Sequence, residues 1–220
     1  MIPSIITPMN FALVRDAICQ HLANCRDNQE QLAQDAGQSV GWISKNIHFV
    51  IFPKRFRFPD VEEMPCVYVY FNRLDFPESE QDVYCNEAVG NLVVEYYTVG
   101  LNDEEDAENF KDADTNAEDR LSYLTSQLYK ILCSEETNIY TATGKIVRGF
   151  KIKSWERIIT PESDNTAGTV LGAKFTFDVE FEEPTYYANT TEIQDFYTNL
   201  DIRDEYISPF IQLILSEENL

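Results

Sequence analysis

The clearest pattern along the chain is a strict alternation of apolar and polar residues near residue 175. Apolar side chains occupy every second position from Ala173 to Phe181, and Lys174, Thr176, Asp178 and Glu180 separate them. Because side chains of a β-strand point alternately to opposite faces, this run predicts a strand with one buried and one solvated face. Enrichment in β-branched and aromatic residues predicts further strands at 66–71, 92–99 and 146–155.

Two amphipathic helices are predicted beside these strands. Apolar residues at three- and four-residue steps form one stripe over residues 10–25 and a second over residues 117–133. Thr7 and Pro8 have the residue types of a helix start, with Thr as cap and Pro in the first turn. The polar stretch 26–38 either continues the first helix or forms a loop. The stripes contain Phe11, Val14, Ile18, Leu22 and Cys25 in the first helix, and Leu121, Leu124, Leu128, Ile131 and Leu132 in the second.

The element order is helix, strand pair, helix, strand pair, and it predicts an α+β fold class. We expect a small antiparallel sheet of about four strands packed against helices. Residues 1–184 are expected to form a single domain, with an extended arm inserted at about residues 31–65. Pro53, Pro59 and Pro65 interrupt that arm and argue against a central strand beyond Phe52. Residues 185–220 are predicted to be a C-terminal helical extension.

Both additions carry apolar side chains that must be covered by the chain's own core or by a partner. In the arm the expected anchors are Phe52, Phe56 and Phe58. In the extension, the residues expected to bind a partner are Phe196, Tyr206, Ile207, Phe210, Ile211 and Ile214.

The charge of the chain restricts its partners. The formal net charge is -21, which repels nucleic acid phosphates unless basic residues gather on one surface. Lys54, Arg55 and Arg57 form the one basic cluster, which suits either a nucleic-acid groove or, in better agreement with the neighbouring Phe and Pro residues, an extended arm. The acidic run 103–119 is read as a solvated loop leading into a helix; a calcium loop would need a glycine that the run lacks.

No catalytic motif stands out in the sequence. His21 and His48 are the two histidines, and neither has a Cys, Asp or Glu at metal-ligand spacing on a shared face. Nucleophile-elbow, P-loop and dinucleotide-binding motifs do not occur. Five scattered cysteines indicate reduced thiols in a cytosol, and no apolar run reaches the length of a membrane span. These observations predict a soluble protein that is not an enzyme and takes no metal or cofactor.

Five segments together suggest a family. They are the N-terminal helix Phe11–Cys25, the strands CVYVYF and LVVEYYTVG, the helix AEDRLSYLTSQLYKIL, and the stretch from KSWERIITPE to GAKFTFDVEFEE. In their order and in their pattern of apolar and polar residues they resemble the tail-terminator family of tailed bacteriophages and, more loosely, neck and tail-completion proteins. The resemblance covers residues 10–30 and 66–183, and the segments 31–65 and 185–220 look like additions to it.

The resemblance implies a structural virion protein with a small sheet that carries helices on one side. Such proteins assemble as a six-fold ring that caps the tail tube, ends tail elongation and provides the docking surface for the head. The implied partners are further copies of the chain in a hexamer, the tail tube protein, a neck or connector protein, and the tail sheath. The implied location is the tail or neck of a virion assembled in the host cytoplasm.

DNA would pass through such a ring without specific binding, and an acidic lumen would not retain it. Asp103, Glu104, Glu105, Asp106 and Glu108 are therefore candidates for a loop that faces the lumen or a partner. Two other readings stay open: a head–tail connector or other neck protein, and a non-viral cytosolic binding domain.

Overall fold

The computed structural model describes residues 9–54, 58–77, 85–101, 112–133, 146–158 and 168–184. The chain divides into two compact units, and all of the described residues belong to the unit formed by residues 8–184. Its helices are α1 (Asn10–Asp35), α2 (Val40–Asn46), the 3-10 helix η2 (Val61–Glu63) and α3 (Ala113–Cys133). Its strands are β1 (Val50–Phe52), β2 (Cys66–Asp75), β3 (Cys85–Leu101), β4 (Val147–Ile158) and β5 (Gly168–Pro184).

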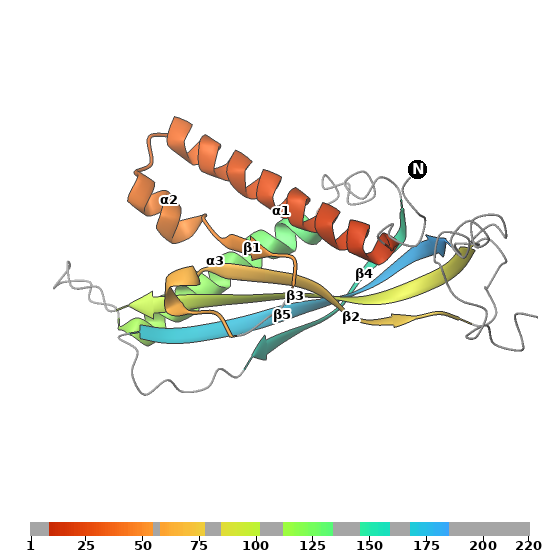
Figure 1. Ribbon diagram of the computed structural model, residues 1–220. Coiled ribbons are helices and arrows are strands. Elements are labelled where there is room, and N and C mark those ends of the chain that lie inside the picture. The colour runs from red at the N-terminus through yellow and green to blue at the C-terminus, as the bar shows by residue number, and fades with distance from the viewer. Residues whose placement is uncertain are drawn as a thin grey trace, which may run out of the picture. The chain divides into compact units, whose positions relative to one another are not determined.

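The strands form one mixed five-stranded sheet in the order β1-β2-β3-β5-β4 (Figure 1). The two predicted antiparallel pairs are present, β2 with β3 and β4 with β5. β3 and β5 pair antiparallel from Cys85–Pro184 to Leu101–Gly168 and so join the two pairs at the centre of the sheet. The predicted α+β class is therefore confirmed. The expected number of about four antiparallel strands is corrected, because β1 adds a fifth strand parallel to β2.

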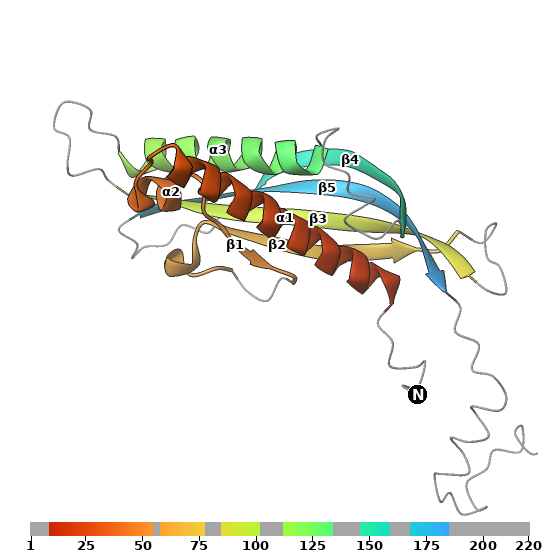
Figure 2. The same cartoon turned by 90° about the horizontal axis from the view of Figure 1, so that it is seen from above.

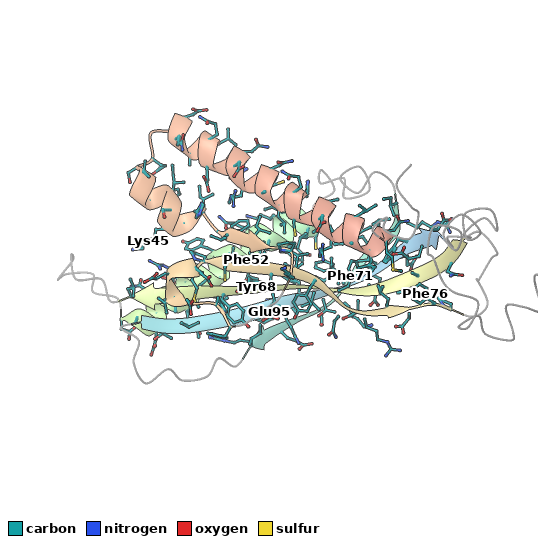
Figure 3. All side chains as sticks on the ribbon, in the orientation of Figure 1. Lys45, Phe52, Tyr68, Phe71, Phe76 and Glu95 are labelled. Atoms are coloured by element: carbon teal, nitrogen blue, oxygen red, sulfur yellow. The ribbon has the colours of Figure 1, made fainter. Side chains whose placement is uncertain are left out.

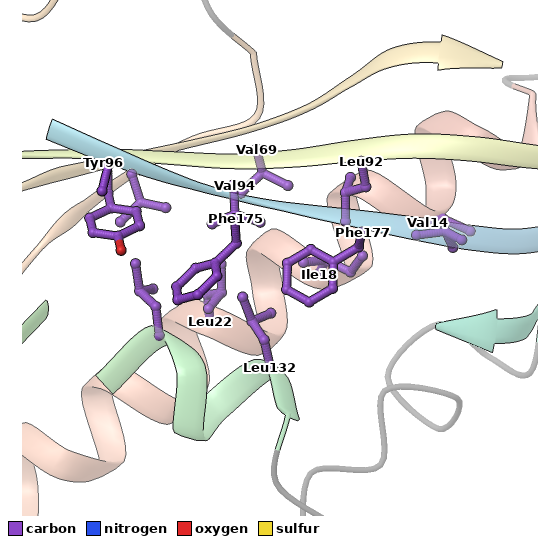
Figure 4. Close-up of a cluster of buried hydrophobic side chains, with 14 of the residues drawn as sticks. Val14, Ile18, Leu22, Val69, Leu92, Val94, Tyr96, Leu132, Phe175 and Phe177 are labelled. Carbon is purple, nitrogen blue, oxygen red and sulfur yellow. The ribbon is translucent and has the colours of Figure 1, made fainter. Parts of the chain in front are cut away.

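Both long helices pack on one side of the sheet, which we call the inner face; the opposite side is the outer face. Seen from above, α1 crosses the strands obliquely and α3 runs along them (Figure 2). Val14, Ile18 and Leu22 of α1 are fully buried against this face (Figure 4), and α3 contributes Leu121, Leu124, Leu128 and Leu132 to the same core. All five apolar residues of the alternating run from Ala173 to Phe181 are buried in the same core, as their spacing predicts.

The start of α1 differs from the prediction and depends on β5. The helix begins at Asn10 with Met9 as N-cap, so Thr7 is not the cap, and the side chain of Met9 makes no capping hydrogen bond. Instead the backbone N–H groups of Asn10 and Phe11 donate to the Glu183 carboxylate at 2.9 and 2.7 Å. A carboxylate at this position satisfies two free donors and complements the helix dipole. At its other end α1 reaches Asp35, so most of the polar stretch 26–38 continues the helix.

Residues 31–65 were predicted to form an extended arm. The described residues of this segment are instead part of the domain. It contains the last turn of α1, then α2, β1 and η2. Arg26 of α1 donates to the Phe49 carbonyl oxygen at 2.7 Å, which ties the helix to the start of β1. The Phe52 ring stacks on Tyr68 with centroids 5.1 Å apart, and Phe58 meets Tyr97 edge-on at 5.0 Å. These two phenylalanines therefore pack on the sheet of their own chain, and Phe56 lies outside the described residues.

Candidate functional site on the outer face of the sheet

A row of polar side chains crosses the outer face over four neighbouring strands. The pairing register places Tyr68 of β2 beside Glu95 of β3, Glu95 beside Lys174 of β5, and Lys174 beside Glu156 of β4. Tyr68 and Glu95 lie on the side of the sheet away from α1 (Figure 3). The row follows from period-2 alternation, because the sequence neighbours of Tyr68, Glu95 and Lys174 point into the core.

Glu95 is the centre of this row and is only 3% exposed. The Tyr70 hydroxyl donates to its Oε2 at 2.6 Å, and the Tyr97 hydroxyl donates to Oε1. A buried carboxylate is costly unless hydrogen bonds replace its hydration, and two hydroxyl donors make charge-assisted bonds to it. The two bonds hold the Tyr70 and Tyr97 hydroxyls against the carboxylate, from β2 and from β3 itself.

A cavity of about 220 Å³ opens beside Glu95. It is lined by Tyr70, Asn72, Val93, Glu95, Ile158 and Lys174. The Lys174 ammonium lies 3.0 Å from Oε2 of Glu156 at its rim. The hydrogen bond from Lys174, with a second from Ser154, holds the pKa of the Glu156 carboxyl below its ordinary value. The cavity therefore presents a carboxylate, an ammonium, an amide and a hydroxyl, which suits recognition of polar groups.

Burial shifts the pKa values of the cysteine and histidine side chains near the sheet and in α1. Burial raises the pKa of the Cys66 thiol to about 12, so the thiol stays protonated at neutral pH. The same effect raises the pKa of Cys19 in α1 to about 12. His21 is part-buried with its Nε2 3.7 Å from the Cys25 sulfur, and desolvation lowers its pKa. Within the described ranges, no three His, Cys, Asp or Glu side chains gather closely enough to hold a metal ion.

The two edges of the sheet are the other exposed surfaces of interest. On β4, Ile152 and Trp155 are exposed although their register partners Phe177 and Phe175 are buried in the core. Trp155 keeps one polar contact, from its indole N–H to the Tyr96 hydroxyl at 2.8 Å. The opposite edge is formed by β1 and the turn through η2, where Val50 and Phe58 are exposed.

The site residues predicted from the sequence are only partly described. The acidic residues from Asp103 to Glu108 and the apolar residues from Phe196 to Ile214 lie outside the described residues, and so does the basic pair Arg55 and Arg57. Phe52 and Phe58 lie at the β1–η2 edge, next to the tyrosines that surround Glu95. The structure thus places the described anchors beside the outer face.

Sequence reasoning did not identify the Glu95 cluster. The signal for it is the single charged residue in the strand LVVEYYTV, whose other residues are apolar or aromatic apart from Thr98. A charge at such a position must either face solvent or find donors, and the tyrosines of the two neighbouring runs supply donors.

The comparisons with known proteins do not assign a family. No family model matches the chain, and no curated protein matches its sequence. None of the helices in the described ranges combines the length and apolar character needed to cross a membrane.

Proposed function

We propose that this protein is a structural component of a bacteriophage tail, a tail-terminator-like subunit that assembles as a ring on the end of the tail tube. The observation that carries the proposal is the fold. Strand pairs β2–β3 and β4–β5 flank α3 in sequence, join into one sheet, and carry α1 and α3 on the same face. This is the arrangement that the tail-terminator resemblance implies.

The chemistry of the described surface supports a role in binding rather than in catalysis. The buried Glu95 carboxylate is held by two tyrosines, and the thiols of Cys19 and Cys66 have strongly raised pKa values. In the part of the chain that the structure describes, the exposed edges β4 and β1–η2 offer apolar and charged side chains to a neighbour. Exposed strand edges with such side chains can pair with another protein chain, which supports a function in assembly.

The proposal is tested by the mass of the full-length protein in solution and by its binding to tail tubes. Native mass spectrometry and light scattering should find a closed ring, with six copies expected, and electron microscopy should find it at the ends of purified tubes. Tubes polymerised with the protein present should stop at shorter lengths than tubes polymerised without it. A chain that stays monomeric beside tail tubes would contradict the proposal. It would instead favour a small binding domain that uses the cavity beside Glu95.

A further inference from the structure

The cavity beside Glu95 carries charges of both signs on neighbouring strands. Glu95 and Lys174 line it and are register partners across β3 and β5. An anion beside the Lys174 ammonium would therefore lie close to the Glu95 carboxylate, and a cation beside the carboxylate would lie close to the ammonium. Lys54, Arg55 and Arg57 lie between β1 and η2 in sequence, and a cation that any of them supplied would compensate the carboxylate further. Opposite charges in one small cavity favour a ligand without net charge.

Both charged groups also have partners within the chain. The Tyr70 hydroxyl donates to Glu95 at 2.6 Å, and a second tyrosine hydroxyl donates to the other carboxylate oxygen. The Lys174 ammonium lies 3.0 Å from Glu156. An ionic or zwitterionic ligand would have to displace these partners and lose its own hydration, and both steps cost free energy. The ligand that fits these walls is therefore uncharged.

Asn72 supplies a polar group that faces the cavity without an internal partner. The pairing of β2 with β3 shifts between Phe71 and Arg73, so Asn72 is the extra residue of a β-bulge. Bulges re-aim side chains and are common beside functional sites. Asn72 lines the cavity, is exposed, and makes no side-chain hydrogen bond with another described residue. Its amide offers both donors and an acceptor, which suits a hydroxyl group because a hydroxyl both donates and accepts.

The rest of the wall is apolar, and the space is small. Val93, Ile158 and the Tyr70 ring line the cavity beside the polar groups. Its volume of about 220 Å³ is below the roughly 300–1,000 Å³ of sites for drug-sized ligands, so it has room for a single small molecule. A sugar unit combines the required properties. It is uncharged, carries hydroxyl groups around its rim, and presents C–H groups on the faces of its ring.

We propose that the cavity beside Glu95 binds a small uncharged polyhydroxyl compound, a single sugar unit, with hydroxyl groups on Asn72 and Lys174 and one ring face on Tyr70. The Lys174 ammonium can keep Glu156 and still donate to the ligand, because an ammonium has three protons. Glu95 acts as a positioning residue, since it accepts the Tyr70 hydroxyl. The site goes beyond the proposed assembly and does not depend on it, because all of these residues belong to one chain.

A titration of the ¹⁵N-labelled full-length protein with uncharged and charged probes tests the site. The uncharged probes are the methyl glycosides of glucose, galactose, mannose and N-acetylglucosamine. The charged probes are inorganic phosphate, ethylammonium and glycine. At least one glycoside should give saturable shifts of amide resonances around the cavity, on β2, β3 and β5, and the charged probes should give none there.

Two variants identify the contacts. Asn72→Ala should weaken glycoside binding by roughly tenfold or more, because the donors and the acceptor of the amide are lost together. Asn28→Ala, at an exposed position of α1, is the matched control and should bind as the unmodified chain does. Lys174→Gln keeps a donor and removes the charge, so it should change the affinity by less than about threefold. Circular dichroism of each variant separates lost binding from lost folding.

Three results would overturn the sugar site. They are the absence of saturable shifts with every glycoside, saturable shifts at the cavity with a charged probe, and glycoside binding that Asn72→Ala leaves unchanged. None of these results bears on the ring proposal, which depends on the mass of the assembly and its binding to tail tubes. A protein that never forms a ring but binds a glycoside through Asn72 would overturn the ring proposal and support the sugar site.

Discussion

The inner and outer faces of the sheet are built from the same strands and are both buried near the centre, yet they are stabilised differently. On β3, Leu92, Val94 and Tyr96 point toward the helices, and Val93, Glu95 and Tyr97 point away from them. All six side chains are nearly inaccessible to solvent. The inner set packs against α1 and α3, whereas the outer set includes a carboxylate that depends on tyrosine hydroxyls.

The difference shows that burial alone does not identify the role of a residue. On the inner face, stability comes from apolar area removed from water, and a lost methylene leaves a cavity. On the outer face it depends on each buried polar group keeping its partner. The inner face has a polar group of its own: burial raises the pKa of the Tyr96 hydroxyl, which is satisfied by Thr125 and Trp155.

The largest expected effect is that of replacing Phe177 on the inner face of β5. Its neighbour Thr176, which points to the outer face, serves as the comparison. Phe177→Ala should lower the free energy of unfolding by about 3–5 kcal/mol, because the ring is 1% exposed and stacks on Phe150. Thr176→Ala, on the outer face, should change it by less than about 0.5 kcal/mol. Urea unfolding at one protein concentration measures both. Equal losses would show that the two faces do not differ in the way described.

A second prediction concerns the hydrogen bonds of the outer face. Tyr70→Phe should cost about 1.5–3 kcal/mol, because it removes one of two hydroxyl donors from the buried Glu95 carboxylate. Tyr123→Phe, on the exposed side of α3, is the control and should have no measurable effect. The same urea titrations suffice. A Tyr70→Phe variant as stable as its parent would mean that Glu95 has other donors sufficient to replace the hydroxyl.

The inner face was predictable from the sequence, and the outer face was not. Regular spacing in α1, α3 and β5 reports which residues face a core, because helices and strands repeat with fixed periods. The strands β2 and β3 were predicted shorter than they are, since Asn72, Arg73, Asn86 and Glu87 interrupt the apolar pattern near their ends. A polar residue in an exposed strand end carries no signal that the strand continues.

The local sequence pattern does not predict β1, because the strand forms through pairing with residues that are distant in the sequence. It is three residues long, and prolines follow it closely in sequence, which is typical of irregular structure. Its strand character comes from parallel pairing with β2, in the register Val50–Cys66 to Phe52–Tyr68. The Glu95 cluster was missed for the same reason, since Tyr70 and Glu95 become neighbours only when β2 and β3 pair. Local patterns cannot report contacts that depend on the register of another strand.

A third prediction uses two glycines that face opposite sides of the sheet. A Cβ at Gly100 would lie 2.0 Å from the Ala113 carbonyl oxygen and 2.4 Å from the Ala117 nitrogen, both in the backbone of α3. Gly100→Ala should therefore push α3 away from β3 and cost about 1–3 kcal/mol. At Gly149 a Cβ would meet the movable carboxylate of Glu180, at 2.7 Å, on the outer face. Gly149→Ala should cost clearly less in the same unfolding measurement, and the reverse order would contradict the close packing of α3.

The smallest expected effect comes from an exposed ion pair on the outer face, which is compared here with the buried Glu95 carboxylate. Arg73 and Asp75 form an ion pair at 2.6 Å on β2, a few residues from Tyr70, but their side chains are 73% and 52% exposed. Solvent screens such a pair, so Arg73→Gln should change the free energy of unfolding by less than about 1 kcal/mol, and 1 M salt should remove even that difference. The loss in Tyr70→Phe should persist in the same salt, because water and ions do not reach a buried carboxylate. If both losses vanished with salt, the Glu95 cluster would be accessible to solvent and could not serve as the fixed centre of the outer face.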